Sequence, residues 1–306
     1  MTVNPMPAAL PVQAFGSTRC RVGESPVWSV AEQALYWVDI EGCRVHRQTW
    51  PDGHHASWPT AERVGCIALH ADGGVLAAME TGLFHLRLSP DGGTASTRLQ
   101  AADFPRDGMR YNDGRCDRQG RFWVTSMVRD MGLAAADGAL FRYDANGLSA
   151  PWVTGLITGN GLGFGPDGTT MYLSDSHPQV QRVWRFDLAA DGTPSDRREF
   201  VDMRALPGRP DGAAVDAEGG YWICANDAGQ VHRFRPDGSL DRSIAVPVSK
   251  PSMCAFGGPE LDLLFITSIV PGAPVEGFDA ALDGAVLVTR PGARGLPEPL
   301  FDPRAH

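Results

Sequence analysis

Six short apolar or aromatic runs recur along the 306 residues of the chain at similar intervals. Measured between their central residues, the successive intervals are 39, 47, 49, 50 and 43 residues. A repeat of this length, built from strand-turn-strand units, is typical of a β-propeller with one four-stranded blade per repeat. The sequence therefore predicts an all-β, six-bladed β-propeller. The runs are LYWVD at 35–39, GVLAAM at 74–79, RFWVTSM at 121–127, TMYLSDS at 170–176, GYWICAN at 220–226 and LLFITSI at 263–269.

The remaining sequence agrees with one all-β domain. The 36 glycines and 24 prolines suit many tight turns between short strands, and no stretch has the period and caps of a helix. We predict an N-terminal tail over residues 1–11 and a single propeller domain over residues 12–306. As is common in β-propellers, we expect residues 12–20 to complete the last blade beside a strand near 284–290.

Charge and cysteine usage exclude several classes of partner. The net charge is −9 and no basic cluster occurs, which argues against nucleic acid and anionic membranes. The N-terminal segment has no basic residue before its apolar part and contains three prolines, so it is neither a secretory signal nor a membrane span. Six scattered cysteines without a CxxC pair predict small buried side chains in a reducing compartment. We therefore expect a cytoplasmic protein, either a monomer or a small homo-oligomer.

Four polar residues share nearly one phase of the repeat, eleven to thirteen residues before the centre of a run. In a propeller the innermost strand of each blade lines the central channel, so residues at this phase should surround one point on the axis. Oxygen donors without Cys or His predict a site for a hard cation, Ca²⁺, Mg²⁺ or Mn²⁺, with Zn²⁺ or Fe²⁺ also possible. The four residues are Glu24, Asn112, Asn160 and Asp211, and the other two repeats have Gly65 and Ser252 at this place.

Turn chemistry explains part of this pattern equally well. Asn112-Asp113-Gly114, Asn160-Gly161 and Asp211-Gly212 are each ordinary turn sequences, because Asn, Asp and Gly tolerate a positive φ. Glu24 has no such turn preference. Spacing alone leaves the metal-site hypothesis and the turn hypothesis both open.

Longer segments around these residues form an ordered set of motifs that covers nearly the whole chain. Together they are similar to the senescence-marker-protein/gluconolactonase/regucalcin family. The resemblance implies a six-bladed propeller with one divalent metal in its central channel and, as in many members, hydrolysis of sugar lactones. The segments are GESPVW (23–28), ALYWVDI (34–40), RYNDGRCDRQGRFWVTSM (110–127), TGNGLGFGPDGTTMYLSDS (158–176), RPDGAAVDAEGGYW (209–222) and KPSMCAFGGPELDLLFITS (250–268).

The resemblance also implies a role for particular residues. It makes Glu24, Asn160 and Asp211 the metal ligands, and Asp211 the carboxylate that transfers protons. Arg110 and Asn112, in the pattern Arg-x-Asn-Asp-Gly, would bind the substrate. An acidic residue in the loop after the third run contacts sugar in some members, and Asp130 is its nearest match.

This set predicts metal-assisted hydrolysis of an aldonolactone to the aldonic acid. The metal would polarise the lactone carbonyl, and Asp211 would take a proton from the attacking water and return it to the ring oxygen. Lys250 and Ser252 are candidates for further contacts, or alternatively a solvated strand end. We expect substrate to enter beside Gly65 and Ser252, where no ligand is supplied.

Three other functions remain as alternatives. The same metal centre would suit a promiscuous esterase or phosphotriesterase. A calcium-binding regulator or a protein-interaction propeller would be non-catalytic, and the fold alone does not decide between them. The carboxylate-amide set with the Arg110 and Asn112 pair favours the enzyme. An interaction propeller has no need of Glu24, Asn160 and Asp211 at one channel mouth.

Overall fold

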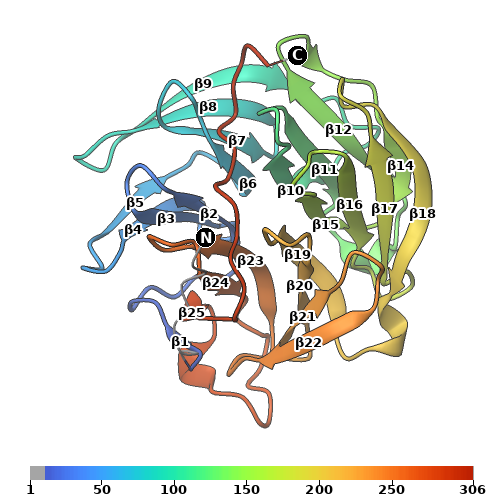
Figure 1. Cartoon of the computed structure of the whole chain (residues 1–306). Helices are drawn as coiled ribbons and strands as arrows, with labels where there is room; N and C mark the ends of the chain where they lie inside the picture. Colours follow the sequence, from blue (N-terminus) through green and yellow to red (C-terminus); the bar gives the residue numbers. More distant parts are fainter. Residues whose placement is uncertain (1–10, 306) are drawn as a thin grey trace, which may run out of the picture.

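The computed structural model describes residues 11–305, which form six β-sheets arranged as blades around a common axis (Figure 1). Five blades have four strands and the third has five, since β14 pairs with β12. Within each blade the chain runs from the innermost strand outward through antiparallel neighbours. The predicted six-bladed propeller is confirmed.

The first three blades occupy the N-terminal half of the chain. Blade 1 consists of β2 (Gly23–Ser29), β3 (Ala34–Asp39), β4 (Arg44–Thr49) and β5 (His55–Pro59). Blade 2 consists of β6 (Val64–Leu69), β7 (Val75–Met79), β8 (Gly82–Leu88) and β9 (Thr94–Ala101). Blade 3 consists of β10 (Met109–Cys116), β11 (Phe122–Val128), β12 (Gly138–Asp144), β13 (Gly147–Leu148) and β14 (Val153–Leu156).

The last three blades complete the ring. Blade 4 consists of β15 (Gly159–Phe164), β16 (Thr170–Asp175), β17 (Arg182–Leu188) and β18 (Pro194–Asp202). Blade 5 consists of β19 (Arg209–Val215), β20 (Tyr221–Asn226), β21 (Gln230–Phe234) and β22 (Leu240–Ala245). Blade 6 consists of β23 (Pro251–Gly257), β24 (Leu263–Ser268), β25 (Leu287–Thr289) and β1 (Gln13–Ala14). The helical elements of the described chain are three 3₁₀ turns, η1 (Met131–Leu133), η2 (Met203–Ala205) and η3 (Ala280–Leu282).

The ring closes by pairing the N-terminal strand with the C-terminal blade. Gln13 lies opposite Val288 and Ala14 opposite Leu287 in an antiparallel pair. The expected closure beside the strand near 284–290 is therefore confirmed. Most of the predicted 1–11 tail, residues 1–10, lies outside the described residues.

The apolar core lies between blades rather than within one sheet. The six sequence runs become the second strands β3, β7, β11, β16, β20 and β24, and every residue of these strands is buried. Both faces of each second strand are covered because neighbouring blades pack against it. Trp37, Trp123 and Trp222 are each 0% exposed, and burial of such a side chain stabilises the fold by roughly 1.5–3 kcal/mol.

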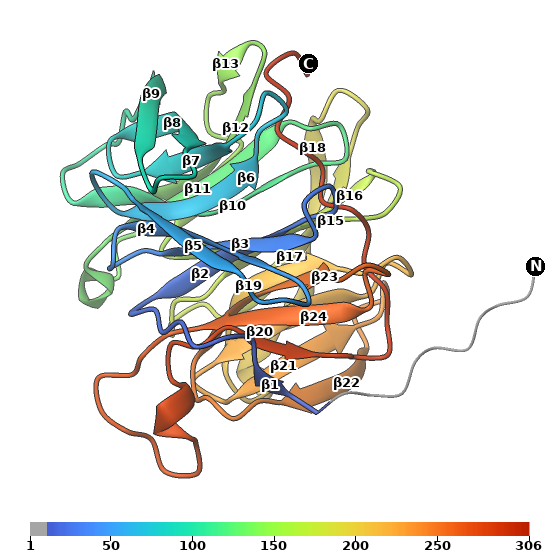
Figure 2. The ribbon, with the colours of Figure 1, turned by 90° about the vertical axis from the view of Figure 1, so that its left-hand side faces the viewer.

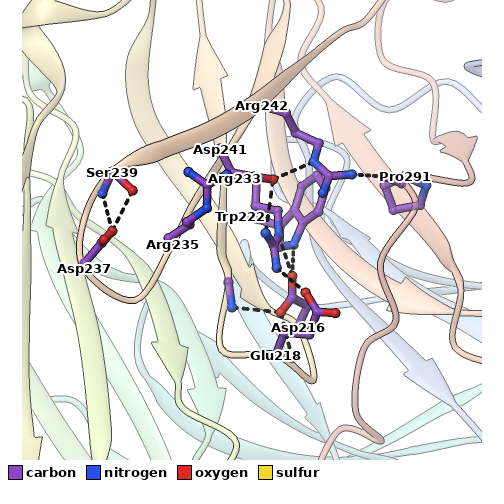
Figure 3. Close-up of polar contacts among 11 residues, drawn as sticks. Asp216, Glu218, Trp222, Arg233, Arg235, Asp237, Ser239, Asp241, Arg242 and Pro291 are labelled. Atoms are coloured by element: carbon purple, nitrogen blue, oxygen red, sulfur yellow. Dashed lines mark hydrogen bonds and ion pairs between the residues drawn. The ribbon is translucent and has the colours of Figure 1, made fainter.

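Two of these tryptophans are fixed by the aspartate of the preceding turn. In blade 5 the Asp216 carboxylate accepts hydrogen bonds of 2.8 Å from Trp222 Nε1 and 2.7 Å from Arg233 Nε (Figure 3). In blade 3 the Asp117 carboxylate accepts the matching bonds from Trp123 and Arg121. The turn sequences DRQG and DAEG thus supply a buried charge that ties turn, strand and tryptophan together.

The C-terminal segment after β25 crosses one face of the ring (red in Figures 1 and 2). It hydrogen-bonds in turn to the blade ends at Leu261, Ala217, Gly120 and Leu69. On the same side, Glu298 reaches the channel-lining Arg115 at 2.6 Å. One end of the channel is therefore covered, and the opposite face carries the site described below.

Within the described residues, no helix is long and apolar enough to cross a membrane. All six cysteines are unpaired, and all but Cys43 are buried, as the sequence predicts.

Candidate metal and substrate site

Each innermost strand has a break in its regular pairing at the same level of the channel. The pairing with the second strand shifts between Glu24 and Val27 in blade 1 and between Asn160 and Gly163 in blade 4. The other four blades have the same shift next to Gly65, Asn112, Asp211 and Ser252. Such a bulge redirects side chains that would otherwise alternate between the two faces of the sheet.

The bulges come in two forms. Glu24 and Asn160 are the last paired residues before the shift, and the next residue has a positive φ, 49° at Ser25 and 63° at Gly161. Asn112 and Asp211 lie inside the shift. All four side chains belong to strands, so the hypothesis that they only shape turns is wrong.

Five of the predicted site residues line one cavity of about 110 Å³ at the open end of the channel. They come from four blades that are far apart in the sequence. A volume of this size has room for a cation together with several water-sized ligands. The five residues are Glu24, Arg110, Asn112, Asn160 and Asp211.

The Asp211 carboxylate is held by a neighbour on the next strand. Asn226, the last residue of β20, donates a hydrogen bond of 2.6 Å from Nδ2 to Asp211 Oδ2. Asp211 Oδ1 makes no hydrogen bond with a described residue and stays available to a ligand. The Asn226 carbonyl Oδ1 is likewise buried and has no partner in the described chain.

Glu24 and Asn160 are positioned by aspartates at the position that corresponds to Asn226. Asp39 ends β3 and accepts hydrogen bonds from the backbone N–H groups of residues 21 and 22, just before Glu24. Asp175 ends β16 and accepts the matching bonds from residues 157 and 158, just before Asn160. The start of each ligand-bearing strand is therefore fixed by a charge-assisted bond.

Glu24 and Asn160, like Asp211, each keep one side-chain oxygen free of hydrogen bonds to the described residues. Asn160 Nδ2 donates to Ser176 Oγ at 2.8 Å, and that hydroxyl donates in turn to Thr158 O at 3.3 Å. This chain of bonds leaves the Asn160 carbonyl oxygen without a partner among the described residues. Glu24 Oε2 accepts only from the Ser25 N–H, at 3.1 Å.

Arg110 and Asn112 form a second pair beside the ligand set. Arg110 Nη1 donates to Asn112 Oδ1 at 2.7 Å and to the Tyr111 carbonyl at 2.8 Å. Asn112 Nδ2 donates to the Gly159 carbonyl of blade 4 at 2.9 Å. Asn112 thus braces the guanidinium of Arg110 against the neighbouring blade.

Two buried carboxylates, Glu24 and Asp211, line the cavity, and a third, Asp113, is buried nearby. Burial, together with the nearby Asp211 and Asp113, raises the pKa of Glu24 well above its ordinary value. Burial raises the pKa of Asp211 to about 7, against the hydrogen bond from Asn226 and the charge of Arg209, which lower it. Burial also raises the pKa of Asp113. A divalent cation bound in the cavity would stabilise the ionised form of these carboxylates.

The donor set fits such a cation. Residues 11–305 contain no cluster of three or more His, Cys, Asp or Glu side chains suited to a metal. The cavity instead offers two carboxylates and one amide, each with one free oxygen. All-oxygen donors are the ligands that Ca²⁺, Mg²⁺ and Mn²⁺ prefer.

Three predicted features lie elsewhere. Asp130 is exposed and outside the cavity lining, and its side chain caps η1 by accepting a bond from the Gly132 N–H. Ser252 is fully buried and hydrogen-bonds to Gly23 O and Thr267 Oγ1. Lys250 lies outside the lining and pairs with Asp227.

Gly65 and Ser252 do not line the cavity, and substrate entry beside them stays a prediction. A Cβ on Gly65 would lie 2.4 Å from Tyr111 O, so the backbones of blades 2 and 3 are in direct contact there. Glycine at this position serves close packing.

Sequence reasoning missed Asn226, Arg209, Ser176 and Met131, which also line the cavity. Asn226 carries a usable signal, because the runs LYWVD, TMYLSDS and GYWICAN place Asp39, Asp175 and Asn226 at the same strand end. Arg209 also carries one, since Arg-Pro-Asp repeats the Arg-x-Asn spacing of residues 110–112. Met131 follows from no such repeat.

Fold and site together define a six-bladed propeller with an oxygen-donor cavity at one channel mouth. The chain belongs to the family described as SMP-30/Gluconolactonase/LRE-like region, whose model matches residues 22–270.

Relatives within this family are similar over nearly their full lengths. A 6-deoxy-6-sulfogluconolactonase of Pseudomonas putida is 39% identical over 284 residues, covering 92% of this chain and 94% of the relative. A pentonolactonase of Haloferax volcanii is 33% identical over 286 residues, with the same coverage of 92% and 94%. The crystal structure of a calcium-binding protein, regucalcin, from Agrobacterium tumefaciens superposes with a TM-score of 0.85 at 26% identity, covering 94% of this chain and 96% of that one.

Proposed function

We propose that this protein is a metal-dependent sugar lactonase that hydrolyses an aldonolactone to the aldonic acid. The observation that carries the proposal is the convergence of Glu24, Asn160 and Asp211 with Arg110 on one cavity. Relatives that bear the name lactonase match 92% of the chain and support a hydrolase acting on a carboxylic ester bond.

Glu24, Asn160 and Asp211 would hold one divalent cation through their free oxygens. When bound, the cation supplies Lewis-acid polarisation of the lactone carbonyl. The three side chains are well suited to this because each is already anchored by a protein hydrogen bond on its other polar atom. Such anchoring preserves ligand geometry during turnover.

Asp211 acts as general base and then as general acid. Its carboxylate takes a proton from the water that attacks the carbonyl, and returns it to the ring oxygen as the ring opens. The bond from Asn226 Nδ2 orients the carboxylate while the proton moves.

Arg110 and Asn112 bind the substrate. The Arg110 guanidinium donates hydrogen bonds to hydroxyl or carbonyl oxygens, and Asn112 holds it in place through a bond of 2.7 Å. Asp130 as a further sugar contact stays a prediction, and its loop adjoins the cavity through Met131. A cytoplasmic location and a monomeric or small oligomeric state also stay predictions.

A screen of γ- and δ-aldonolactones tests the proposal. Chelated protein is assayed by pH-stat alone and after addition of Ca²⁺, Mg²⁺, Mn²⁺, Zn²⁺ or Fe²⁺. We expect hydrolysis only with a divalent ion, and a preference for certain lactones over aryl esters and phosphotriesters. Tight calcium binding without hydrolysis of any of these would instead favour the non-catalytic reading, in line with the calcium-binding relative of known structure. Faster turnover of aryl esters or phosphotriesters would favour the promiscuous hydrolase.

A further inference from the structure

Four of the six innermost strands have a basic residue at or next to their first residue, near the ligand set, and these four residues form a basic ring. In each blade the position concerned is one residue before the last pair that precedes the bulge. Blades 1 and 4 have Gly23 and Gly159 there. The other four blades have Arg63, Arg110, Arg209 and Lys250.

The charge of this ring is compensated on one side only. In blade 2, Arg63 pairs with Glu41 at 2.8 Å and with Glu80 at 3.2 Å, so its charge is fully countered. In blades 5 and 6, Arg209 and Lys250 share the single carboxylate of Asp227. Two cations therefore share one anion, and the other carboxylate beside Arg209, Asp211, belongs to the proposed metal site.

The Arg209 side chain forms part of the cavity wall. Its Nε donates to Asp227 Oδ2 at 2.7 Å and its Nη1 donates to the Ser176 carbonyl at 3.2 Å. A guanidinium has five N–H donors, so most of the donor capacity remains for a ligand. The side chain is 21% exposed, as the wall of an open cavity requires.

Asp227 fixes the two cations relative to each other. It lies in the turn after β20 with φ 73°, a left-handed conformation that aspartate tolerates better than most residues. Its two oxygens face different blades, Oδ2 toward Arg209 and Oδ1 toward Lys250. The result is a preorganised pair of donors across the boundary between blades 5 and 6.

Arg209 also has a defined relation to the proposed base. It precedes Asp211 by two residues on the same strand, which corresponds to about 7 Å along the chain. Both side chains line the same cavity. A small molecule reacting at Asp211 would therefore extend past Arg209 toward the rim.

We propose that Arg209 and Lys250, held by Asp227, form a subsite for an anionic substituent on the lactone. A carboxylate, sulfonate or phosphate at the end of the sugar remote from the ester would pair with the two cations that share Asp227. The inference rests on the proposed lactonase function and deepens it, because it selects anionic over neutral sugar lactones. The competing account is a purely structural clamp between blades 5 and 6.

The test compares metal-loaded protein on matched substrates. D-Glucono-1,5-lactone is the neutral probe, and its 6-phosphate, its 6-deoxy-6-sulfonate and D-glucaro-1,4-lactone carry the three anionic groups. We expect the wild type to favour at least one anionic probe by kcat/KM. The ratio of anionic to neutral kcat/KM should fall at least ten-fold in R209Q/K250Q, and in part in the single variant K250Q, which keeps the cavity wall intact.

The salt dependence of the ratio and a control substitution at another paired arginine distinguish the subsite from a structural clamp. Raising the salt from about 20 to 200 mM should lower the wild-type ratio but not that of the double variant, because an exposed charge is screened. R235Q removes an arginine that also pairs with an aspartate of blade 5, on its outer strands, and should keep the wild-type ratio. An unchanged ratio in R209Q/K250Q and K250Q would leave only the clamp, even if lactone hydrolysis stands.

A binding measurement distinguishes failure of the subsite from failure of the lactonase. Calorimetry with 6-phosphogluconate, glucarate and gluconate does not depend on turnover. A preference for 6-phosphogluconate and glucarate over gluconate that is lost in K250Q supports the subsite even if no lactone is hydrolysed. Equal binding of all three by the wild type overturns it.

Discussion

Asn226 Nδ2 lies 2.6 Å from Asp211 Oδ2 and donates to it inside the channel. The pair spans the first two strands of blade 5, and register places Asn226 opposite Arg209. Blades 1 and 4 use the same strand end differently, since Asp39 and Asp175 bind backbone N–H groups there. In blade 5 the residue at this strand end therefore binds a side chain of the site, whereas in blades 1 and 4 it binds the backbone.

Replacing Asn226 by leucine should lower kcat about 10- to 100-fold with little change in KM. Leucine is close in size to asparagine but cannot donate to Asp211, and a lost hydrogen bond to a charged group corresponds to about 1.5–3 kcal/mol. The fold should survive, because Asn226 Oδ1 has no partner among the described residues. Steady-state kinetics and a thermal unfolding curve measure the two effects.

Gln230→Leu is the matched control for this variant. Gln230 begins β21 on the same blade, and its side chain makes no hydrogen bond within the described chain. It should keep wild-type kcat. Wild-type kcat in Asn226→Leu would show that the bond does not orient Asp211.

Asp211→Asn should abolish most lactone hydrolysis while the protein stays folded. The amide keeps an oxygen for the cation but cannot accept a proton, and loss of a general base costs roughly 10²–10⁴-fold in rate. The expected result is weakened but measurable metal binding by calorimetry together with the loss of kcat. Full activity in this variant would remove Asp211 from the mechanism.

The repeat brings four polar residues to one height of the ring, and the family resemblance implies which three of them are metal ligands. Glu24, Asn160 and Asp211 share that height, and six short strands leave few other ways to arrange them. The contacts of Asn226 and Arg209 depend on the pairing register, which the bulge in each blade shifts by one residue. Turn length and bulge form decide that shift, and neither follows from hydrophobic periodicity.

The sequence repeat also does not predict how neighbouring blades pack or where the loops lie. Gly65 suggests an open channel in sequence, yet its backbone contacts Tyr111 of the next blade. Asp130 lies in a loop whose position depends on distant contacts, including His177 Nε2 at 3.2 Å from Met131 O. Such contacts join residues 46 positions apart and have no local sequence signature.

Asp216→Ala should lower the free energy of unfolding by about 3 kcal/mol or more. The carboxylate is 0% exposed and accepts from Trp222, Arg233 and two turn N–H groups (Figure 3). Alanine leaves these buried donors without their acceptor. Urea unfolding measures the loss.

Glu218→Ala provides the comparison for Asp216→Ala. Glu218 pairs with the same Arg233, at 3.0 Å, but its side chain is 80% exposed. Exposed pairs contribute little, so its loss should change stability by less than about 0.5 kcal/mol. Equal effects of the two substitutions would contradict the role assigned to the buried aspartate.

His46→Phe should make stability less dependent on pH between about 7 and 5. His46 is 6% exposed, stacks on Trp37 at 5.2 Å, and its pKa is lowered to about 4 by burial and then by His55. The unfolded chain, with a histidine pKa near 6.5, binds more protons in this range, so stability falls as the pH drops from about 6.5 toward 4. From pH 7 to 5 the wild type should lose about 2 kcal/mol more than His46→Phe, as measured by urea unfolding at each pH. His54→Gln, in the exposed turn nearby, should keep the wild-type slope, and parallel slopes for wild type and His46→Phe would show that His46 is not held neutral by the fold.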